Sequence, residues 1–172
     1  LRKATAELLT MARRLGEPSA VHIGVGAERA QVTLAKYGAH KVYVVDNADA
    51  AAYLVAPQAE ILAALVEKVS PAAVLISSNA AGKEIAARLA IKTGSGVITD
   101  AVDVRPGDNG IETTQSVFAG SYTVTSRVTT GTPIIAVKPN SIALEASPAA
   151  GAVEAFEVTV SVPALAPTLP VT

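Results

Sequence analysis

The clearest candidates for chemistry are two glycines that follow a short apolar run. Gly24 and Gly26 separate an expected strand from an expected helix, and Asp46 ends the next strand about twenty residues later. This arrangement is typical of dinucleotide-binding loops, in which amides at a helix start bind phosphate and a carboxylate binds ribose. Arg29 stands where the third glycine of that pattern allows close packing of helix on sheet. The pattern is therefore incomplete, and we predict that it does not hold NAD.

A second glycine-containing turn, Asn79 to Lys83, precedes another expected helix. It ends in Gly-Lys as a phosphate-binding loop does, but a serine replaces the upstream glycine, and Glu84 replaces the Ser or Thr that would hold magnesium. Because Ser and Asn are good N-caps, we expect Ser78 or Asn79 to cap the helix and Gly82 to tighten the turn. A backbone anion site at this helix start is the less favoured interpretation.

The remaining polar residues form no recognisable catalytic or metal-binding pattern. The chain has no Cys, which excludes thiolate metal sites, disulfides and a cysteine nucleophile. His22 lies in an expected strand and His40 in a loop, and neither belongs to a triad signature. Asp100 and Asp103 are three residues apart in an extended segment, so they face opposite ways and suit solvated or turn-capping roles. We assign no catalytic, cofactor-binding or metal-binding residue.

The first hundred residues alternate between helical and extended patterns. Apolar spacing and stop signals predict helices over 3–15, 27–37, 57–69 and 83–91, and strands over 20–24, 41–45, 73–77 and 97–104. In the first helix the expected apolar face consists of Ala4, Leu8, Met11, Ala12 and Leu15. Such alternation predicts a parallel sheet covered by helices on both faces.

After about residue 101 the pattern changes to extended segments separated by glycines. Segments 102–104, 111–118, 122–128 and 133–138 predict antiparallel ribbons, and the alternation of Phe156, Val158, Val160 and Val162 predicts one more strand over 155–162. Pro163, Pro167 and Pro170 then indicate an exposed interdomain linker over 163–172.

Composition fits one compact domain over residues 1–162. The chain has 172 residues, 50% of them hydrophobic, and a formal net charge of -1. Its charges are scattered, which argues against a nucleic-acid partner. No apolar run reaches the roughly 18 residues that span a bilayer. Because the chain starts at Leu without Met, and its first element is a helix, we expect further sequence upstream.

Several ordered blocks resemble electron transfer flavoprotein alpha subunits. The first is SSNAAGKEIAARLA at 77–90, and it is followed by GSG at 94–96 and DAVD at 100–103. The later blocks are QSVFAGSY at 115–122 and TPIIAVKP at 132–139, and residues 1–26 resemble the family's first helix and second strand. The resemblance covers nearly the whole chain.

The resemblance implies a fold and the places where the cofactors bind. It implies a Rossmann-like, adenine nucleotide alpha hydrolase-like α/β fold of three layers, with a mostly parallel sheet and added antiparallel strands. In this family FAD binds mainly in the carboxy-terminal domain of the alpha subunit, and AMP in the beta subunit. We therefore expect no FAD on these residues, and we expect the family's first strand, which normally precedes the helix near Lys3, to be missing.

Two hypotheses about function follow. The first is a non-catalytic scaffold domain of a bacterial, cytoplasmic electron transfer flavoprotein alpha subunit, which pairs with a beta subunit as a heterodimer. By resemblance, the complete complex carries electrons from dehydrogenases, such as the acyl-CoA dehydrogenases of fatty acid beta-oxidation, to a membrane quinone reductase. The contact with the beta subunit is expected to include the ribbon region from Ile111 to Lys138. The alternative is a free-standing nucleotide-binding module that uses Gly24 and Gly26 or the turn from Asn79 to Lys83.

Overall fold

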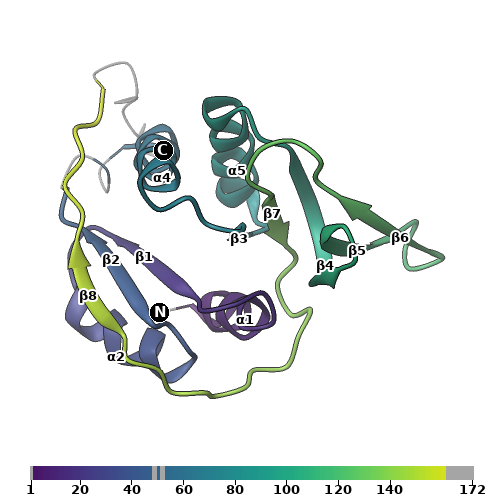
Figure 1. The fold of residues 1–172 in the computed structure, drawn as a ribbon, viewed down its shortest axis with the longest axis horizontal. Helices are drawn as coiled ribbons and strands as arrows, with labels where there is room; N and C mark the ends of the chain where they lie inside the picture. The colour runs from purple at the N-terminus through teal and green to yellow at the C-terminus, as the bar shows by residue number, and fades with distance from the viewer. Residues whose placement is uncertain (1, 48–49, 51–52, 162–172) are drawn as a thin grey trace, which may run out of the picture.

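The computed structural model describes residues 2–47, 50 and 53–161, and Figure 1 shows their arrangement. The helices are α1 (Lys3–Ala12), α2 (Ala27–Lys36), α4 (Ala56–Val69) and α5 (Ala80–Thr93). The strands are β1 (Ser19–Ile23), β2 (Lys41–Val45), β3 (Val74–Ser77), β4 (Val97–Gly107), β5 (Gly110–Val117), β6 (Tyr122–Arg127), β7 (Ile134–Val137) and β8 (Ala152–Ala155). Among the helices described, none is both long and apolar enough to cross a membrane.

The strands form two sheets, where we predicted a single parallel sheet. One sheet has the order β1-β2-β8 and is wholly parallel, and the other has the order β3-β7-β4-β5-β6. The four predicted parallel strands are thus divided, with β1 and β2 in the first sheet and β3 and β4 in the second. Within the described ranges, no strand pairs with the outer edge of β1 or of β3. A parallel strand between these two edges would join the sheets into one.

Helices cover both faces of each sheet, which confirms the three-layer α/β fold. On one side, Leu34 of α2 packs on the first sheet, while α1 packs Leu9 on the first sheet and Met11 on the second. On the other side, α5 packs Leu89 on the second sheet, and α4 packs Ile61 on the first sheet. Because α4 also contacts the α5 cluster through Leu62 and Val66, α1 and α4 each bridge the two sheets, one on either side.

Strand β7 departs from the antiparallel ribbon that we predicted over 133–138. It runs parallel to both β3 and β4 and lies between them. All four of its side chains are buried, because Ile135 and Val137 face the α1 side while Ile134 and Ala136 face the α5 side. A strand buried on both faces needs an unbroken apolar run, which is a parallel-sheet feature. The antiparallel ribbons that we predicted on β4, β5 and β6 are confirmed.

The last strand lies earlier than predicted. We expected a strand over 155–162, but β8 covers Ala152–Ala155 and residues 156–161 form no strand. The alternating residues Phe156, Val158 and Val160 pack on the core of the first sheet instead. The backbone N–H of Phe156 donates to Val44 at 2.9 Å, and the segment then leaves the sheet. Residue 162 and the predicted linker over 163–172 lie outside the described residues.

Two helix boundaries differ from the prediction for local reasons. Helix α1 ends at Ala12, and a turn continues to Leu15, whose N–H donates to Ala12 at 2.9 Å. Its buried face is wider than predicted, since Leu9 is buried beside Met11 where the helix bridges two sheets. Helix α5 begins at Ala80, before the predicted start at Lys83, because Asn79 already caps it.

Candidate functional site

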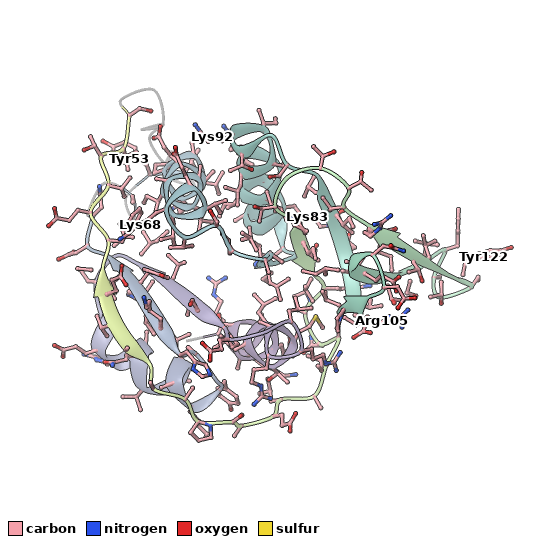
Figure 2. All side chains as sticks on the ribbon, in the orientation of Figure 1. Tyr53, Lys68, Lys83, Lys92, Arg105 and Tyr122 are labelled. Atoms are coloured by element: carbon pink, nitrogen blue, oxygen red, sulfur yellow. The ribbon has the colours of Figure 1, made fainter. Side chains whose placement is uncertain are left out.

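The most organised polar group lies at the carboxyl end of the second sheet. Ser78 follows β3, Asp100 lies in β4, and Lys83 comes from the first turns of α5 (Figure 2 labels Lys83). We call these three residues the Asp100 cluster. The carboxyl ends of parallel strands are where α/β proteins commonly bind ligands. The Asp100 cluster therefore lies where a ligand-binding site is expected in a fold of this class.

The three side chains of the Asp100 cluster satisfy one another. The Oδ1 atom of Asp100 accepts a hydrogen bond from Ser78 Oγ at 2.9 Å, and Oδ2 accepts one from Lys83 Nζ at 2.8 Å. The backbone N–H of Asp100 donates to Ser78 Oγ at 3.3 Å. Asp100 has a φ of 57°, in the left-handed region that non-glycine residues seldom adopt. The cluster thus ties the start of α5 to β4.

The electrostatics of the cluster suit binding or positioning better than proton transfer. The hydrogen bond from Lys83 lowers the pKa of Asp100 below its ordinary value, with Ser78 and the charges of Lys83 and Lys138 acting in the same direction, although burial opposes them. A carboxylate with a lowered pKa is a weak general base at neutral pH. Lys83 is itself paired with this carboxylate.

The predicted cap of α5 is confirmed, and so is the role of its glycine. Asn79 Oδ1 accepts a hydrogen bond from the backbone N–H of Gly82 at 2.8 Å. A Cβ at Gly82 would lie 1.9 Å from the carbonyl oxygen of Ser77, so only glycine allows the helix to start this close to β3. One backbone N–H at this helix start, that of Gly82, is therefore already hydrogen-bonded to the cap residue Asn79.

Residues 24–26 connect β1 to α2 at the carboxyl end of the first sheet, and we call them the Gly24 loop. Gly24 and Gly26 have φ values of 94° and 86°, and Gly26 caps α2 without a side-chain hydrogen bond. Arg29 is exposed, and Ala30 is the buried residue that packs toward the sheet. Asp46 is exposed just beyond β2, as the spacing predicted. The expectation that this loop does not hold NAD stays a prediction.

The histidines and Asp103 do not join either group. His22 contacts the carbonyl oxygen of Val25 through Nε2 at 3.0 Å, and His40 is exposed. Asp103 pairs with Arg14 beyond α1 at 2.6 Å, whereas Asp100 pairs with α5, so the predicted opposite orientation of these carboxylates is confirmed. Among the described residues, no three His, Asp or Glu side chains gather as a metal site would require.

Sequence reasoning missed the Asp100 cluster because its members are distant in sequence. It placed Asp100 in a solvated or turn-capping role, but the fold brings Asp100 to Ser78 and Lys83, which lie 22 and 17 positions away. Part of a signal was available, since Ser78 directly follows the predicted strand over 73–77, and the carboxyl ends of parallel strands meet at one edge of a sheet. Asp100 lies in the middle of the predicted strand over 97–104, so the sequence did not place it at that edge.

Comparison with known proteins gives a consistent result. The profile of the electron transfer flavoprotein domain family matches residues 1–162. The chain is 46% identical over 168 residues to the electron transfer flavoprotein subunit alpha of Mycobacterium tuberculosis, and the aligned region covers 96% of this chain and 51% of that protein. It is 45% identical over 166 residues to the same subunit of Mycobacterium leprae, covering 95% of this chain and 51% of that protein.

A more distant relative has a different name. The chain is 30% identical over 122 residues to the lactate dehydrogenase (NAD(+),ferredoxin) subunit LctC of Acetobacterium woodii, covering 62% of this chain and 29% of that protein. The chain spans about half the length of the mycobacterial relatives that it matches. With the family profile covering 1–162 and the alpha subunits aligned along almost all of the chain, this chain belongs to the electron transfer flavoprotein family, among its alpha subunits.

Proposed function

We propose that this chain is the non-catalytic scaffold domain of an electron transfer flavoprotein alpha subunit. The observation that carries the proposal is the Asp100 cluster, whose side chains satisfy one another at the edge of the second sheet where α/β proteins commonly bind ligands. Its carboxylate has a lowered pKa, and its lysine is paired, so neither is free for acid–base work. Family membership supplies the context, because the named relatives are electron transfer subunits.

The flavin is proposed to bind elsewhere in the alpha subunit. By the family resemblance, FAD belongs to the carboxy-terminal domain of such subunits and AMP to the beta subunit. The chemistry of this chain supports that division, since only 3% of its residues are aromatic and it has no Trp, leaving little to stack on an isoalloxazine ring. The role of residues 1–162 is then to hold the complex together and to position the flavin-bearing part.

The proposal also covers the electron donors and the electron acceptor. By resemblance, the complete heterodimer takes electrons from dehydrogenases such as those for acyl-CoA in fatty acid beta-oxidation, and passes them to a membrane quinone reductase. One relative is named as a subunit of a lactate dehydrogenase, which supports a proposal that donors vary among proteins with this domain. The proposed compartment is a bacterial cytoplasm, and the bacterial relatives support it.

Absorbance tests the position of the flavin. The 172-residue chain is incubated with excess FAD, desalted, and scanned across the visible flavin bands. The proposal predicts a colourless protein with no retained flavin. Stoichiometric FAD that remains bound after desalting would show that these residues form a flavin site, and would contradict a scaffold role.

The second candidate is a nucleotide-binding module. It is favoured by the left-handed glycines of the Gly24 loop and by the carboxylate of Asp46 beyond the next strand. A ligand that binds only the native state raises the melting temperature, so thermal shift with AMP, ATP and NAD separates the two candidates. A saturable shift that Gly26→Val abolishes would establish the module. We predict no shift with any of the three.

A further inference from the structure

The hairpin of β5 and β6 extends from the body of the molecule. Figure 1 shows it at the far end of the second sheet, and Figure 2 shows Tyr122 at its end, away from the helices. The contacts of α1 and α5 with this sheet fall on β3, β4 and β7. Among the described residues, strand β6 is the last strand of the sheet and has one unpaired edge, and five of its six residues are exposed.

Apart from Arg127 at its last position, β6 lacks the features that normally prevent edge-to-edge pairing. Natural edge strands are protected by lysines, prolines, bulges or short length. Residues 113–126 contain no charged residue and no proline, and β6 pairs with β5 through six residues without a register shift. Its Tyr, Thr and Val residues favour extended structure. Strand β6 is therefore a ready template for a further strand.

Strand β8, one of the two edge strands of the first sheet, is protected in a way that β6 is not. Strand β8 has only four residues and carries Glu154, which Lys41 and Lys68 hold at 2.8 and 3.0 Å. A short edge with a fixed charge resists pairing with another chain. In the described part of the chain, the edge strand β8 is therefore protected by its short length and its charge, whereas the edge strand β6 is longer and carries a charge only at its last residue, Arg127.

The tip of the hairpin presents an aromatic pair on a strained turn. Phe118 and Ala119 have φ values of 50° and 54°, and Gly120 follows with 90°. Strained residues of this kind persist where the surrounding structure or a function requires them. Phe118 is 79% exposed, Tyr122 is 66% exposed, and their rings meet edge to face with centroids 5.9 Å apart. Exposed aromatic residues are typical anchors of protein interfaces.

We propose that the beta subunit pairs an extended, uncharged segment with the open edge of β6 and covers Phe118 and Tyr122 with apolar side chains. This proposal rests on the proposed function, which supplies the partner subunit. Addition of a strand to an exposed sheet edge is an established mode of recognition, in which main-chain hydrogen bonds give affinity and side-chain contacts give specificity. The absence of charge along 113–126 calls for an equally uncharged partner segment.

A second copy of this chain fits the edge less well. In an antiparallel pair, two residues that lie directly opposite each other either both form hydrogen bonds across the pair or both do not. If two copies of β6 paired about a two-fold axis, the axis would therefore place one residue of β6 opposite its own copy. With the axis at Val124, Tyr122 faces Ser126 of the second copy. The aromatic tip then lies near the hairpin base, which carries Asp108 and Arg127. In this register, self-pairing would set the exposed rings against charge, whereas a partner with an apolar segment would bury them.

Hydrogen exchange and calorimetry with the beta subunit test the proposal on the full chain. In the complex, the backbone amides of residues 122–127 should exchange more slowly than in the free chain. Val124→Lys places a charge at the middle of the open edge, and Phe118→Ser removes one ring of the tip. Each should weaken binding at least about tenfold, which is the scale of a lost interface anchor. Val153→Lys, at an exposed valine of β8, is the matched control and should leave the affinity unchanged.

The outcomes separate this proposal from the proposed function. Binding that neither Val124→Lys nor Phe118→Ser weakens, with exchange protection confined to other elements, would overturn the β6 assignment and leave the scaffold role intact. A stable homodimer of the free chain with protected β6 amides that the beta subunit does not displace would assign the edge to a second copy, and would also overturn it. No binding to the beta subunit at all would remove both proposals.

Discussion

At the scale of single residues, the account depends on the pairing of Asp100 with Lys83. The hydrogen bond from Lys83 is the main cause of the lowered pKa of Asp100, and its ordinary value is 3.8. A carboxyl whose pKa is lower in the folded state stabilises the fold above the unfolded pKa, and this contribution is lost as the pH falls through the folded pKa. Both side chains are nearly half exposed, so the contribution should stay below about 1 kcal/mol.

We predict that Asp100 titrates below 3.8 in the folded chain and that Lys83→Met raises its pKa toward that value. Carbon NMR of the carboxyl group across pH 2 to about 6 measures this directly. Lys92→Met is the control, because Lys92 lies on the same helix but 3.9 Å from Glu60. A pKa of Asp100 at or above 3.8 in the unmodified chain would contradict the cluster geometry.

Gly82 provides a steric test of the same site. An added Cβ would lie 1.9 Å from the carbonyl oxygen of Ser77, which is rigid backbone of β3. We predict that Gly82→Ala lowers the free energy of unfolding by about 2 kcal/mol or more, measured by urea denaturation. Gly94→Ala at the other end of α5 meets no atom within 4 Å and has a φ of 60°, so it should cost only about 1 kcal/mol. Equal costs would show that close approach is not what requires glycine at 82.

The role of a residue was predictable from the sequence where its partners lie within a few positions along the chain. The cap by Asn79 and the tight turn at Gly82 involve residues within a few positions of one another, and both are confirmed. The role of Asp100 depends on which strands become neighbours. Its partners Ser78 and Lys83 are reached only because β7 enters between β3 and β4 and sets their spacing.

At the scale of elements, β8 is held by charge as well as by backbone pairing. Glu154 accepts hydrogen bonds from Lys41 and Lys68, and these contacts lower the pKa of Glu154 and raise that of Lys41. Lys68 belongs to α4, so the carboxylate links β8 to β2 and to the helix above them. Lys68 also lies 5.2 Å from the ring centroid of Phe156, at the end of the same strand.

We predict that Glu154→Gln loosens β8 without unfolding the chain. The amides of Ala152 and Phe156, which donate to His40 and Val44, should exchange several-fold faster, as measured by hydrogen exchange. Acidification below the lowered pKa of Glu154 should have the same effect, because protonation removes the charge that the lysines hold. Glu84→Gln is the control, since within the described part of the chain Glu84 pairs with Arg88 of its own helix, and it should leave β8 unchanged. Unaltered exchange in Glu154→Gln would show that backbone pairing alone holds the strand.

The errors in strand prediction have a common physical cause. The apolar run of β7 was correctly predicted as a strand, whereas the alternating run after β8 forms no strand, and the sequence alone could not select the neighbours of either segment. β7 became parallel because helices bury both of its faces. The alternation of Phe156, Val158 and Val160 reports one-sided packing on the first sheet, not strand pairing. Periodicity identifies the buried side of a segment, while register and direction depend on tertiary contacts.

At the scale of the whole molecule, two sheets are held together by helices on both sides. Helices α1 and α4 contact both sheets, and the edge strands among the described residues are β1 and β8 of the first sheet and β3 and β6 of the second. The three layers follow from the alternation of helical and extended patterns, so the fold class was predictable from the sequence. The division into two sheets was not, because it depends on which strand edges are paired.

The central claim is that this chain is a scaffold that assembles with a flavoprotein beta subunit. Titration calorimetry of the 172-residue chain against the purified beta subunit tests it most directly. The account predicts a saturable heat with a stoichiometry of one to one, for a chain that carries no flavin. No heat at high micromolar concentrations of both proteins, under conditions where each is folded by circular dichroism, would contradict it.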